Sequence, residues 1–174
     1  MNKDFLLFKF DKVSSTQDLA KILSKDTDYE FAVSAKTQSG GYGRRKTKWF
    51  SPPGGIYLTL CLKRNISPAD LPKISVKTAF AVKEYLDSLA IKSEIKHPND
   101  IMAYINKEKR KICGILCETS KENGIYRIFV GVGLNLNNKA PKRCTAVSVF
   151  EILKTKTDEE EAEKSLISLI RKAF

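Results

Sequence analysis

The chain has 174 residues, of which 42% are hydrophobic and 29% are charged. This composition is that of an ordinary folded protein and excludes a disordered chain, while the lack of any apolar stretch of about 18 residues excludes a membrane-spanning helix. Lysine and arginine outnumber aspartate and glutamate by 31 to 20, and the net charge of +11 favours polyanionic partners such as nucleotides, nucleic acids or acidic proteins without choosing among them.

The amino terminus and the cysteines both favour the cytoplasm. Charges interrupt the apolar run of residues 1–9 too early for a signal peptide. The four cysteines form no CxxC pair, and the single histidine cannot complete a zinc site with them at the usual spacing. We therefore expect reduced and mostly buried thiols, with Cys113 and Cys117 on one face of a strand.

Apolar periodicity predicts the elements in chain order. They are a strand at 5–13, a helix at 16–25, strands at 30–36 and 56–62, a helix from about 70 to 90, strands at 92–97, 101–105, 111–118 and 125–136, a short helix after Ser148, and a helix at 158–173. This order predicts an α+β fold, a mixed β-sheet packed against helices, in one domain over residues 1–174. We expect no helix-turn-helix unit before the first strand.

The helix near residues 70–90 and the last two strands allow finer predictions. We expect Pro72 in the first turn of that helix. Its apolar face should include Ile74, Ala79, Phe80, Val82, Leu86 and Leu89. The strands at 111–118 and 125–136 should form a hairpin.

A glycine-rich loop at residues 37–55 is the first of four segments that can carry chemistry. It contains Gln-Ser-Gly-Gly-Tyr-Gly-Arg-Arg-Lys-Thr-Lys-Trp at 38–49. Glycines permit tight turns and close approach of the backbone, while the cations can neutralise phosphate charge. The loop has no Walker spacing, and its composition fits a phosphate-binding loop and a mobile loop that binds nucleic acid non-specifically equally well.

The second and third segments lie in the middle of the chain. Lys-His-Pro-Asn-Asp at 96–100 presents an amide and a carboxylate on a turn that proline makes rigid, although such turns are commonplace. Arg-Lys-Ile-Cys-Gly-Ile-Leu-Cys-Glu at 110–118 places Lys111 at the start of a strand, on a sheet edge. Gly114 then marks a place where a ligand could lie on the sheet, or else Lys111 is a surface lysine beside a β-bulge.

The fourth segment is Val-Gly-Val-Gly-Leu-Asn-Leu-Asn at 130–137. Gly131 and Gly133 fall on the same face of a strand because side chains alternate between faces. The pair clears room for something flat and bulky, either a ligand or a closely packed helix.

Taken together, the four segments resemble biotin protein ligases over nearly the whole chain, from Ser15 to the region of Ser148. That family shows Ser-Thr-Asn, a glutamine-rich lead into Gly-Arg-Gly-Arg-Arg-Gly-Arg and Trp-Phe-Ser-Pro, then Lys-Trp-Pro-Asn-Asp, Arg-Lys-Leu-Ala-Gly-Ile-Leu-Val-Glu and Gly-hydrophobic-Gly-hydrophobic-Asn. The counterparts here lie at 15–17, 38–52, 96–100, 110–118 and 131–135. The resemblance implies the biotin/lipoate protein ligase catalytic-domain fold, with neither a DNA-binding helix-turn-helix nor a complete C-terminal SH3-like barrel.

The resemblance also implies a two-step reaction. The biotin carboxylate attacks the α-phosphate of ATP to give biotinyl-5′-adenylate, and a carrier lysine then displaces AMP. ATP and biotin are the expected substrates and Mg²⁺ the expected ion. The expected partner is the biotin carboxyl carrier protein of acetyl-CoA carboxylase or a related carboxylase, and a homodimer is compatible with the sequence.

Each matched residue carries an implied role. Lys111 and Arg44 would be the catalytic cations, placed where negative charge accumulates. The residues expected to bind biotin are Ser15, Thr16, Gln17, Gln38, Gly41, Tyr42, Arg44, Lys111, Gly114, Gly131 and Gly133, the last three making room for its ring and tail. The residues expected to bind ATP are Arg44, Arg45, Trp49, Lys96, Asn99, Lys111 and Asn135, with Trp49 near the adenine and Asn135 at its amino edge. Asp100 is the expected magnesium ligand.

The chain departs from the family pattern at a few matched positions. Gln17 replaces asparagine, Tyr42 replaces the first arginine of the loop, Lys46 and Thr47 replace the later Gly-Arg, and His97 replaces tryptophan. We expect Tyr42 to pack on biotin and donate a hydrogen bond to it. His97 should be a packing substitution.

Two other functions are compatible with parts of the sequence. A lipoate or octanoate ligase or transferase of the same fold would share the carrier-lysine chemistry, but the loop and the Trp-Phe-Ser-Pro that follows look more like the biotin branch. A basic nucleic-acid-binding module would use the charge of +11, but the chain has no recognition helix and no RNP-type aromatics. We expect only weak, salt-dependent DNA binding without sequence specificity.

Overall fold

The computed structural model describes residues 5–122, 124–140 and 145–174. Its strands are β1 (Leu6–Val13), β2 (Phe31–Gln38), β3 (Ile56–Arg64), β4 (Ser93–Lys96), β5 (Asp100–Ile105), β6 (Glu108–Glu122) and β7 (Ile125–Leu134). Its α-helices are α1 (Thr16–Leu23), α2 (Lys73–Ser88), α3 (Val149–Leu153) and α4 (Glu159–Lys172), and two short 3-10 helices span Arg44–Lys46 and Pro68–Asp70.

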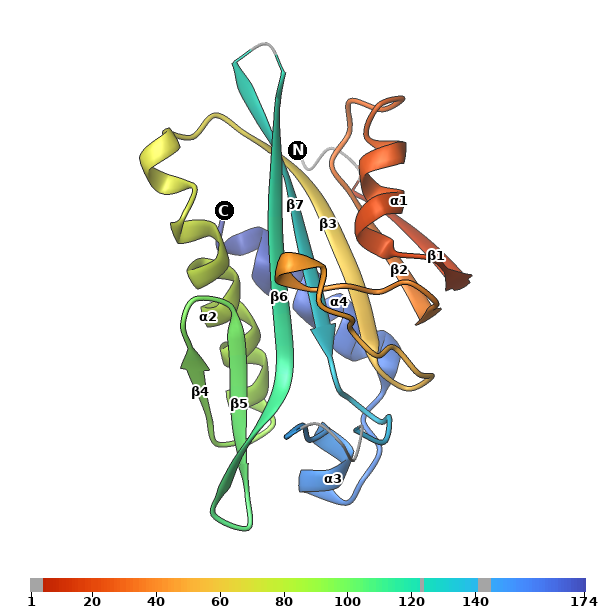
Figure 1. The fold of residues 1–174 in the computed structure, drawn as a ribbon, viewed down its shortest axis with the longest axis vertical. Helices are drawn as coiled ribbons and strands as arrows, with labels where there is room; N and C mark the ends of the chain where they lie inside the picture. The colour runs from red at the N-terminus through yellow and green to blue at the C-terminus, as the bar shows by residue number, and fades with distance from the viewer. Residues whose placement is uncertain (1–4, 123, 141–144) are drawn as a thin grey trace.

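The strands of the described residues form one seven-stranded sheet in the order β1-β2-β3-β7-β6-β5-β4. β1 is parallel to β2, and every other neighbouring pair is antiparallel. Helix α1 packs on one face, while α2 and α4 pack on the other (Figure 1). This arrangement confirms the predicted α+β fold, including the hairpin of β6 and β7.

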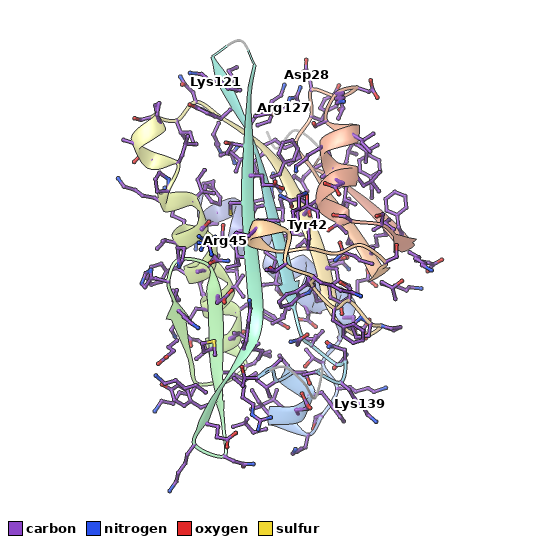
Figure 2. All side chains as sticks on the ribbon, viewed as in Figure 1. Asp28, Tyr42, Arg45, Lys121, Arg127 and Lys139 are labelled. Atoms are coloured by element: carbon purple, nitrogen blue, oxygen red, sulfur yellow. The ribbon has the colours of Figure 1, made fainter. Side chains whose placement is uncertain are left out.

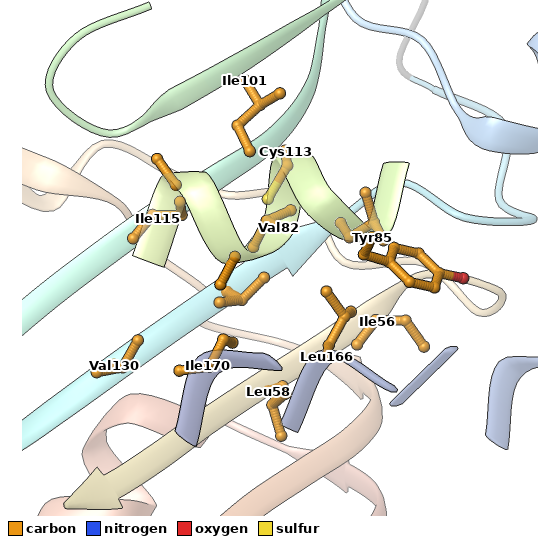
Figure 3. Packing of buried hydrophobic residues seen from close by; sticks show 14 of the residues in the cluster. Ile56, Leu58, Val82, Tyr85, Ile101, Cys113, Ile115, Val130, Leu166 and Ile170 are labelled. Carbon is orange, nitrogen blue, oxygen red and sulfur yellow. The ribbon is translucent and has the colours of Figure 1, made fainter. Parts of the chain in front are cut away.

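The main hydrophobic core lies between the sheet and the helices α2 and α4. Leu58 of β3 and Val130 of β7 point into it and meet Val82 of α2 and Leu166 of α4 (Figure 3). All four side chains are at most 1% exposed. Burial of this apolar surface is the main force that holds the helices on the sheet.

β6 begins at Glu108, three residues earlier than the sequence predicts. The charged residues 108–110, which the sequence assigns to a loop, belong to the strand because the turn before them contains only Asn106 and Lys107. Both turn residues have positive φ (49° and 67°), as a tight two-residue hairpin turn requires. The side chains of residues 108–110 are exposed, which explains their polar pattern.

Two predictions about α2 are wrong. The helix begins at Lys73, after the 3-10 turn, so Pro72 precedes its first turn. Phe80 is 59% exposed, whereas Thr78 and Val82 are fully buried. A residue two positions from both lies on the opposite side of a helix with 3.6 residues per turn, so Phe80 faces solvent.

The described cysteines are free thiols. Cys61 and Cys113 are buried and Cys117 is partly buried, while Cys144 lies outside the described residues. Cys113, Ile115 and Cys117 share the core-facing side of β6, as predicted. Burial raises the pKa of the Cys61 thiol to about 11, so this group stays protonated at neutral pH. None of the helices within the described ranges is long and apolar enough to cross a membrane.

The packing of α2 predicts that two substitutions on this helix differ strongly in their effect on the free energy of unfolding. Leu86→Ala should lower the free energy of unfolding by about 2–5 kcal/mol because it leaves a cavity at a fully buried position. Phe80→Ala should change it by no more than about 0.5 kcal/mol. Urea denaturation followed by circular dichroism measures both, and equal losses would contradict the packing described here.

Candidate active site

A cavity of about 560 Å³ opens on the α1 face of the sheet. Its size is typical of small-molecule sites. Residues from α1, β3, β6, β7 and the glycine-rich loop line it, together with Thr145 and Ala146. The predicted site residues that line this cavity are Ser15, Thr16, Gln17, Gln38, Tyr42, Arg44, Arg45, Trp49, Asn99, Asp100, Lys111, Gly114, Gly131, Gly133 and Asn135.

Strand alternation explains why there is space on this face. Val130, Val132 and Leu134 of β7 belong to the core, so Gly131 and Gly133, which alternate with them, point toward the cavity. Thr59 takes the same side of β3. The prediction that both glycines share one open face is confirmed.

Buried hydroxyl and amide groups form a polar base at one end of the cavity. Gln38 Oε1 accepts from the Thr16 backbone N–H at 2.8 Å and from Thr16 Oγ1 at 3.2 Å. Gln38 Nε2 donates to Ser51 Oγ at 2.9 Å. Thr59 Oγ1 lies 2.9 Å from Thr16 Oγ1. Ser15 caps α1 beside this group, accepting from the Asp18 N–H at 3.3 Å.

Gln17 fills the floor of the polar base. Its Nε2 donates to the Phe129 carbonyl at 3.2 Å, and Thr59 Oγ1 lies 3.2 Å from its Oε1. A Cβ at Gly131 would come within 2.6 Å of Gln17 Oε1. Gly131 therefore makes room for Gln17 in this structure.

Trp49 covers the other two glycines. A Cβ at Gly133 would lie 2.5 Å from the indole Nε1, and one at Gly114 would lie 2.9 Å from Cζ3. In this structure the indole occupies the space over Gly114 and Gly133 that was expected to hold the ring and tail of biotin. Gly131 and Gly133 lie in β7, and Asn135 follows its last residue. Trp49 over Gly133 therefore divides the polar base from Asn135.

Asn135 lies beyond Trp49 and is held in place. It is 3% exposed, and Asn138 Nδ2 donates to its Oδ1 at 3.0 Å. Fixing the amide oxygen in this way orients the amino group of Asn135 as a hydrogen-bond donor.

A β-bulge at Ile112 in β6 directs the Lys111 side chain into the cavity. Ile101 of β5 pairs with Cys113 and Met102 pairs with Lys111, so the register passes over Ile112. The extra residue is a β-bulge, which turns Lys111 to the same face as Gly114; Lys111 Cε would lie 3.3 Å from a Cβ there. Lys111 lies two residues before Cys113, the first residue of β6 that pairs with β7. On that side its backbone bonds to residues 145–147, outside the strands of the sheet, which agrees with the predicted position at a sheet edge.

Lys111 is paired with Asp100. Its Nζ lies 2.7 Å from Asp100 Oδ1 and 5.2 Å from the centre of the Trp49 ring. Among the described residues that line the cavity, Asp100 is the one carboxylate, and no group of three metal-ligating side chains occurs in the described ranges. One carboxylate fits a magnesium ion shared with substrate phosphates, not a site built from protein alone.

The glycine-rich loop crosses in front of the sheet. Arg44 Nη1 donates to Asn99 Oδ1 at 3.1 Å, and Asn99 Nδ2 donates to the Ile115 carbonyl at 2.9 Å. Figure 2 shows Tyr42 and Arg45 on opposite sides of this segment. Arg44 and Arg45 are exposed and line the cavity, so both guanidinium groups can reach an anion at its mouth.

Tyr42 departs from its expected contact. Its ring lines the cavity, but its hydroxyl donates to Asp18 Oδ1 at 2.6 Å. Burial, followed by the hydrogen bond to Asp18, raises the pKa of Tyr42, so the phenol keeps its proton. That single proton is bound to a carboxylate and is not offered to the cavity.

Three other positions lie outside the cavity lining. Gly41 is buried in the base of the loop, where the backbone N–H of Trp49 donates to its carbonyl at 2.9 Å. Lys96 is exposed at the end of β4. His97 is also exposed, so its interpretation as a packing substitution is wrong.

Two residues of the polar base, Thr59 and Ser51, are not among those predicted from the sequence. Thr59 could have been found, because it alternates with Leu58 and Leu60 and must lie on the opposite face of its strand. Ser51 could not, because its role depends on the fold of the loop, where Gln38 N–H donates to the Ser51 carbonyl at 3.4 Å.

Comparisons with known proteins place these features in a family. The sequence model of the Biotin/lipoate A/B protein ligase family matches residues 7–135. The bifunctional ligase/repressor BirA of Escherichia coli is 37% identical over 108 residues, covering 60% of this chain and 32% of that protein. Biotin–protein ligase 2 of Arabidopsis thaliana is 30% identical over 138 residues, covering 76% of this chain and 41% of that protein.

A solved structure agrees over most of the fold. Biotin protein ligase from Aquifex aeolicus in complex with biotin and ATP has a TM-score of 0.79 and 27% identity, covering 96% of this chain and 69% of that chain. The present chain spans about a third to two fifths of the length of the curated relatives named above. With the match to residues 7–135, these findings show that the chain belongs to the Biotin/lipoate A/B protein ligase family.

Proposed function

We propose that this chain is an ATP-dependent biotin protein ligase that forms biotinyl-5′-adenylate and transfers biotin to a lysine of a biotin carboxyl carrier protein. The observation that carries the proposal is one cavity that joins a buried polar base, an indole divider and Lys111. The relative from Aquifex aeolicus, with biotin and ATP bound, supports this assignment of the two substrates.

The polar base suits the ureido ring of biotin. That ring carries two N–H donors and a carbonyl acceptor, which the groups of Ser15, Thr16 and Gln38 can match. The dithiolane ring of lipoate and the chain of octanoate offer no such groups. They would leave buried hydroxyls and amides unpaired, which is costly and gives strong discrimination.

The first step needs positive charge where carboxylate and phosphate meet. A carboxylate oxygen of biotin attacks the α-phosphorus, the bond to the β-phosphate oxygen breaks, and pyrophosphate leaves. Lys111 can stabilise the charge on the transferring phosphoryl group once Asp100 releases it, and Arg44 can bind the same anion from the loop. Asp100 would hold magnesium, and a bound magnesium ion would supply further charge neutralisation on the phosphates.

The second step needs protection of a mixed anhydride from water. The carrier lysine, as a neutral amine, attacks the acyl carbon, AMP leaves with the bonding electrons, and the amide product loses a proton. Trp49 and the glycine-rich loop cover the cavity between the two steps. Asn135 would donate to the adenine and fix the nucleotide beyond the indole.

Biotin transfer is the first test. Purified protein with radiolabelled biotin and an acceptor domain should label the acceptor only when ATP and a divalent ion are both present. Excess lipoate or octanoate should not reduce the labelling, since neither satisfies the polar base. Efficient transfer of lipoate would instead assign the chain to lipoylation.

Alanine substitutions at Lys111 and Arg44 should affect different steps of the reaction. Lys111→Ala should slow adenylate formation by about a hundredfold or more, the effect of losing one preorganised charge-stabilising group. Arg44→Ala should weaken adenylate retention, so that free biotinyl-adenylate appears and stray lysines become labelled. Single-turnover pyrophosphate release and a gel for off-target biotin measure the two effects.

Lys83→Ala is the matched control for this pair. Lys83 forms an ion pair of the same 2.7 Å length with Asp87, on α2 and far from the cavity lining. It should leave both readouts unchanged. A normal rate of adenylate formation in Lys111→Ala, or tight retention in Arg44→Ala, would disprove the role given to that residue.

A further inference from the structure

Tyr42 sits at the centre of a polar cluster that joins three separate parts of the fold. We call it the Tyr42 clasp and define it as Tyr42, Asp18, Lys21 and Glu118. Tyr42 belongs to the glycine-rich loop, Asp18 and Lys21 to α1, and Glu118 to β6. The Tyr42 hydroxyl lies 2.6 Å from Asp18 Oδ1 and 3.3 Å from Glu118 Oε2.

Lys21 completes the clasp and offsets one of its two negative charges. Its ammonium lies 2.7 Å from Glu118 Oε2 and 3.3 Å from the Tyr42 hydroxyl oxygen. The two carboxylates therefore have one ammonium and one phenolic proton between them. A hydrogen bond from the neutral Tyr42 hydroxyl to a carboxylate is strong, because its acceptor is charged. Partial burial of Tyr42 strengthens this bond further.

The loop tip has few other tethers in the described structure. Backbone bonds such as Gly43 N–H to the Thr47 carbonyl at 2.7 Å stay within the loop. Lys46 contributes another internal contact, with its Nζ 3.6 Å from the centre of the Tyr42 ring. The bond from Arg44 to Asn99 is exposed to solvent, where hydrogen bonds compete with water.

We propose that Tyr42 is a positioning residue, which fastens the glycine-rich loop to α1 and β6 through the Tyr42 clasp before any substrate binds. The loop is thereby held over the cavity by a contact of the protein itself. A preorganised loop loses less conformational freedom when the ligand arrives. Tyr42 bonds to α1 and β6, whereas Arg44 bonds to Asn99, so two separate contacts restrain the loop.

The proposal deepens the ligase function proposed above and rests on it for one consequence only. If the loop covers a reactive adenylate, loosening the clasp should increase the fraction of adenylate that escapes into solution. The state of the loop in the free protein can be tested with no assumption about the reaction.

Limited trypsin digestion of the ligand-free protein tests the clasp directly. The loop carries trypsin sites at Arg44, Arg45, Lys46 and Lys48, all exposed, and cleavage there requires local opening of the loop. Tyr42→Phe removes only the hydroxyl and keeps the ring against Lys46. Cleavage after residues 44–48, identified by mass spectrometry, should become about tenfold faster, the effect of losing one hydrogen bond to a charged group.

Tyr29→Phe is the matched control. It makes the same chemical change at a tyrosine that is 58% exposed and lies between α1 and β2. Its cleavage rate should equal that of the parent. The midpoint of thermal unfolding, measured for each variant, separates loop opening from global unfolding.

A double-mutant cycle keeps the test specific to the clasp. Asp18→Ala alone should accelerate loop cleavage, and adding Tyr42→Phe to it should have little further effect, because both remove the same bond. Strictly additive effects, or an unchanged cleavage rate in Tyr42→Phe, would overturn the proposal. A change confined to the KM for biotin would also overturn it and make Tyr42 a ligand contact.

The same variants separate this proposal from the proposed function. In the biotin assay, Tyr42→Phe should release several times more free adenylate for each pyrophosphate formed. If the parent forms no adenylate at all, the ligase assignment fails but the digestion result still decides the clasp. Faster digestion with unchanged adenylate release would overturn the link between the clasp and retention.

Discussion

The alternation of side chains along β3 and β7 is the constraint on which the rest of this structure depends. The same strands must fill a core on one face and leave space on the other. Leu58 and Val130 fill the core against α2 and α4. Thr59 and Gly131 face the other side, where Gln17 and the cavity lie. Because the core is built on the far face, the near face can omit side chains at little cost to packing.

Two local devices turn this open face into a divided site. The bulge at Ile112 rotates Lys111 toward the cavity, and the loop lowers Trp49 onto Gly114 and Gly133. The indole separates a region rich in neutral hydrogen-bonding groups from one that contains Lys111 and Asn135. A molecule that is polar at one end, anionic in the middle and aromatic at the other matches this order of environments.

Much of the fold could be predicted from local sequence, but the aim of particular side chains could not. The shared face of Gly131 and Gly133 follows from alternation alone, whereas the direction of Lys111 depends on a bulge that is visible only when β5 and β6 are paired. Phe80 was assigned to the wrong side of α2, although counting by 3.6 residues would have excluded it. The partners of Tyr42 lie 24 and 76 positions away, and no local pattern reports contacts at such separations.

The central claim is that one divided cavity holds biotin and nucleotide on either side of Trp49. Trp49 is the single tryptophan of the chain, so its fluorescence reports on this site alone. The most direct measurement is a titration of the protein with a non-reactive phosphodiester analogue of biotinyl-adenylate. The account predicts a saturable change in Trp49 emission at one analogue per chain, weaker in Gln38→Ala and in Asn135→Ala alike. Binding that leaves the emission unchanged, or that is weakened by only one of the two substitutions, would contradict it.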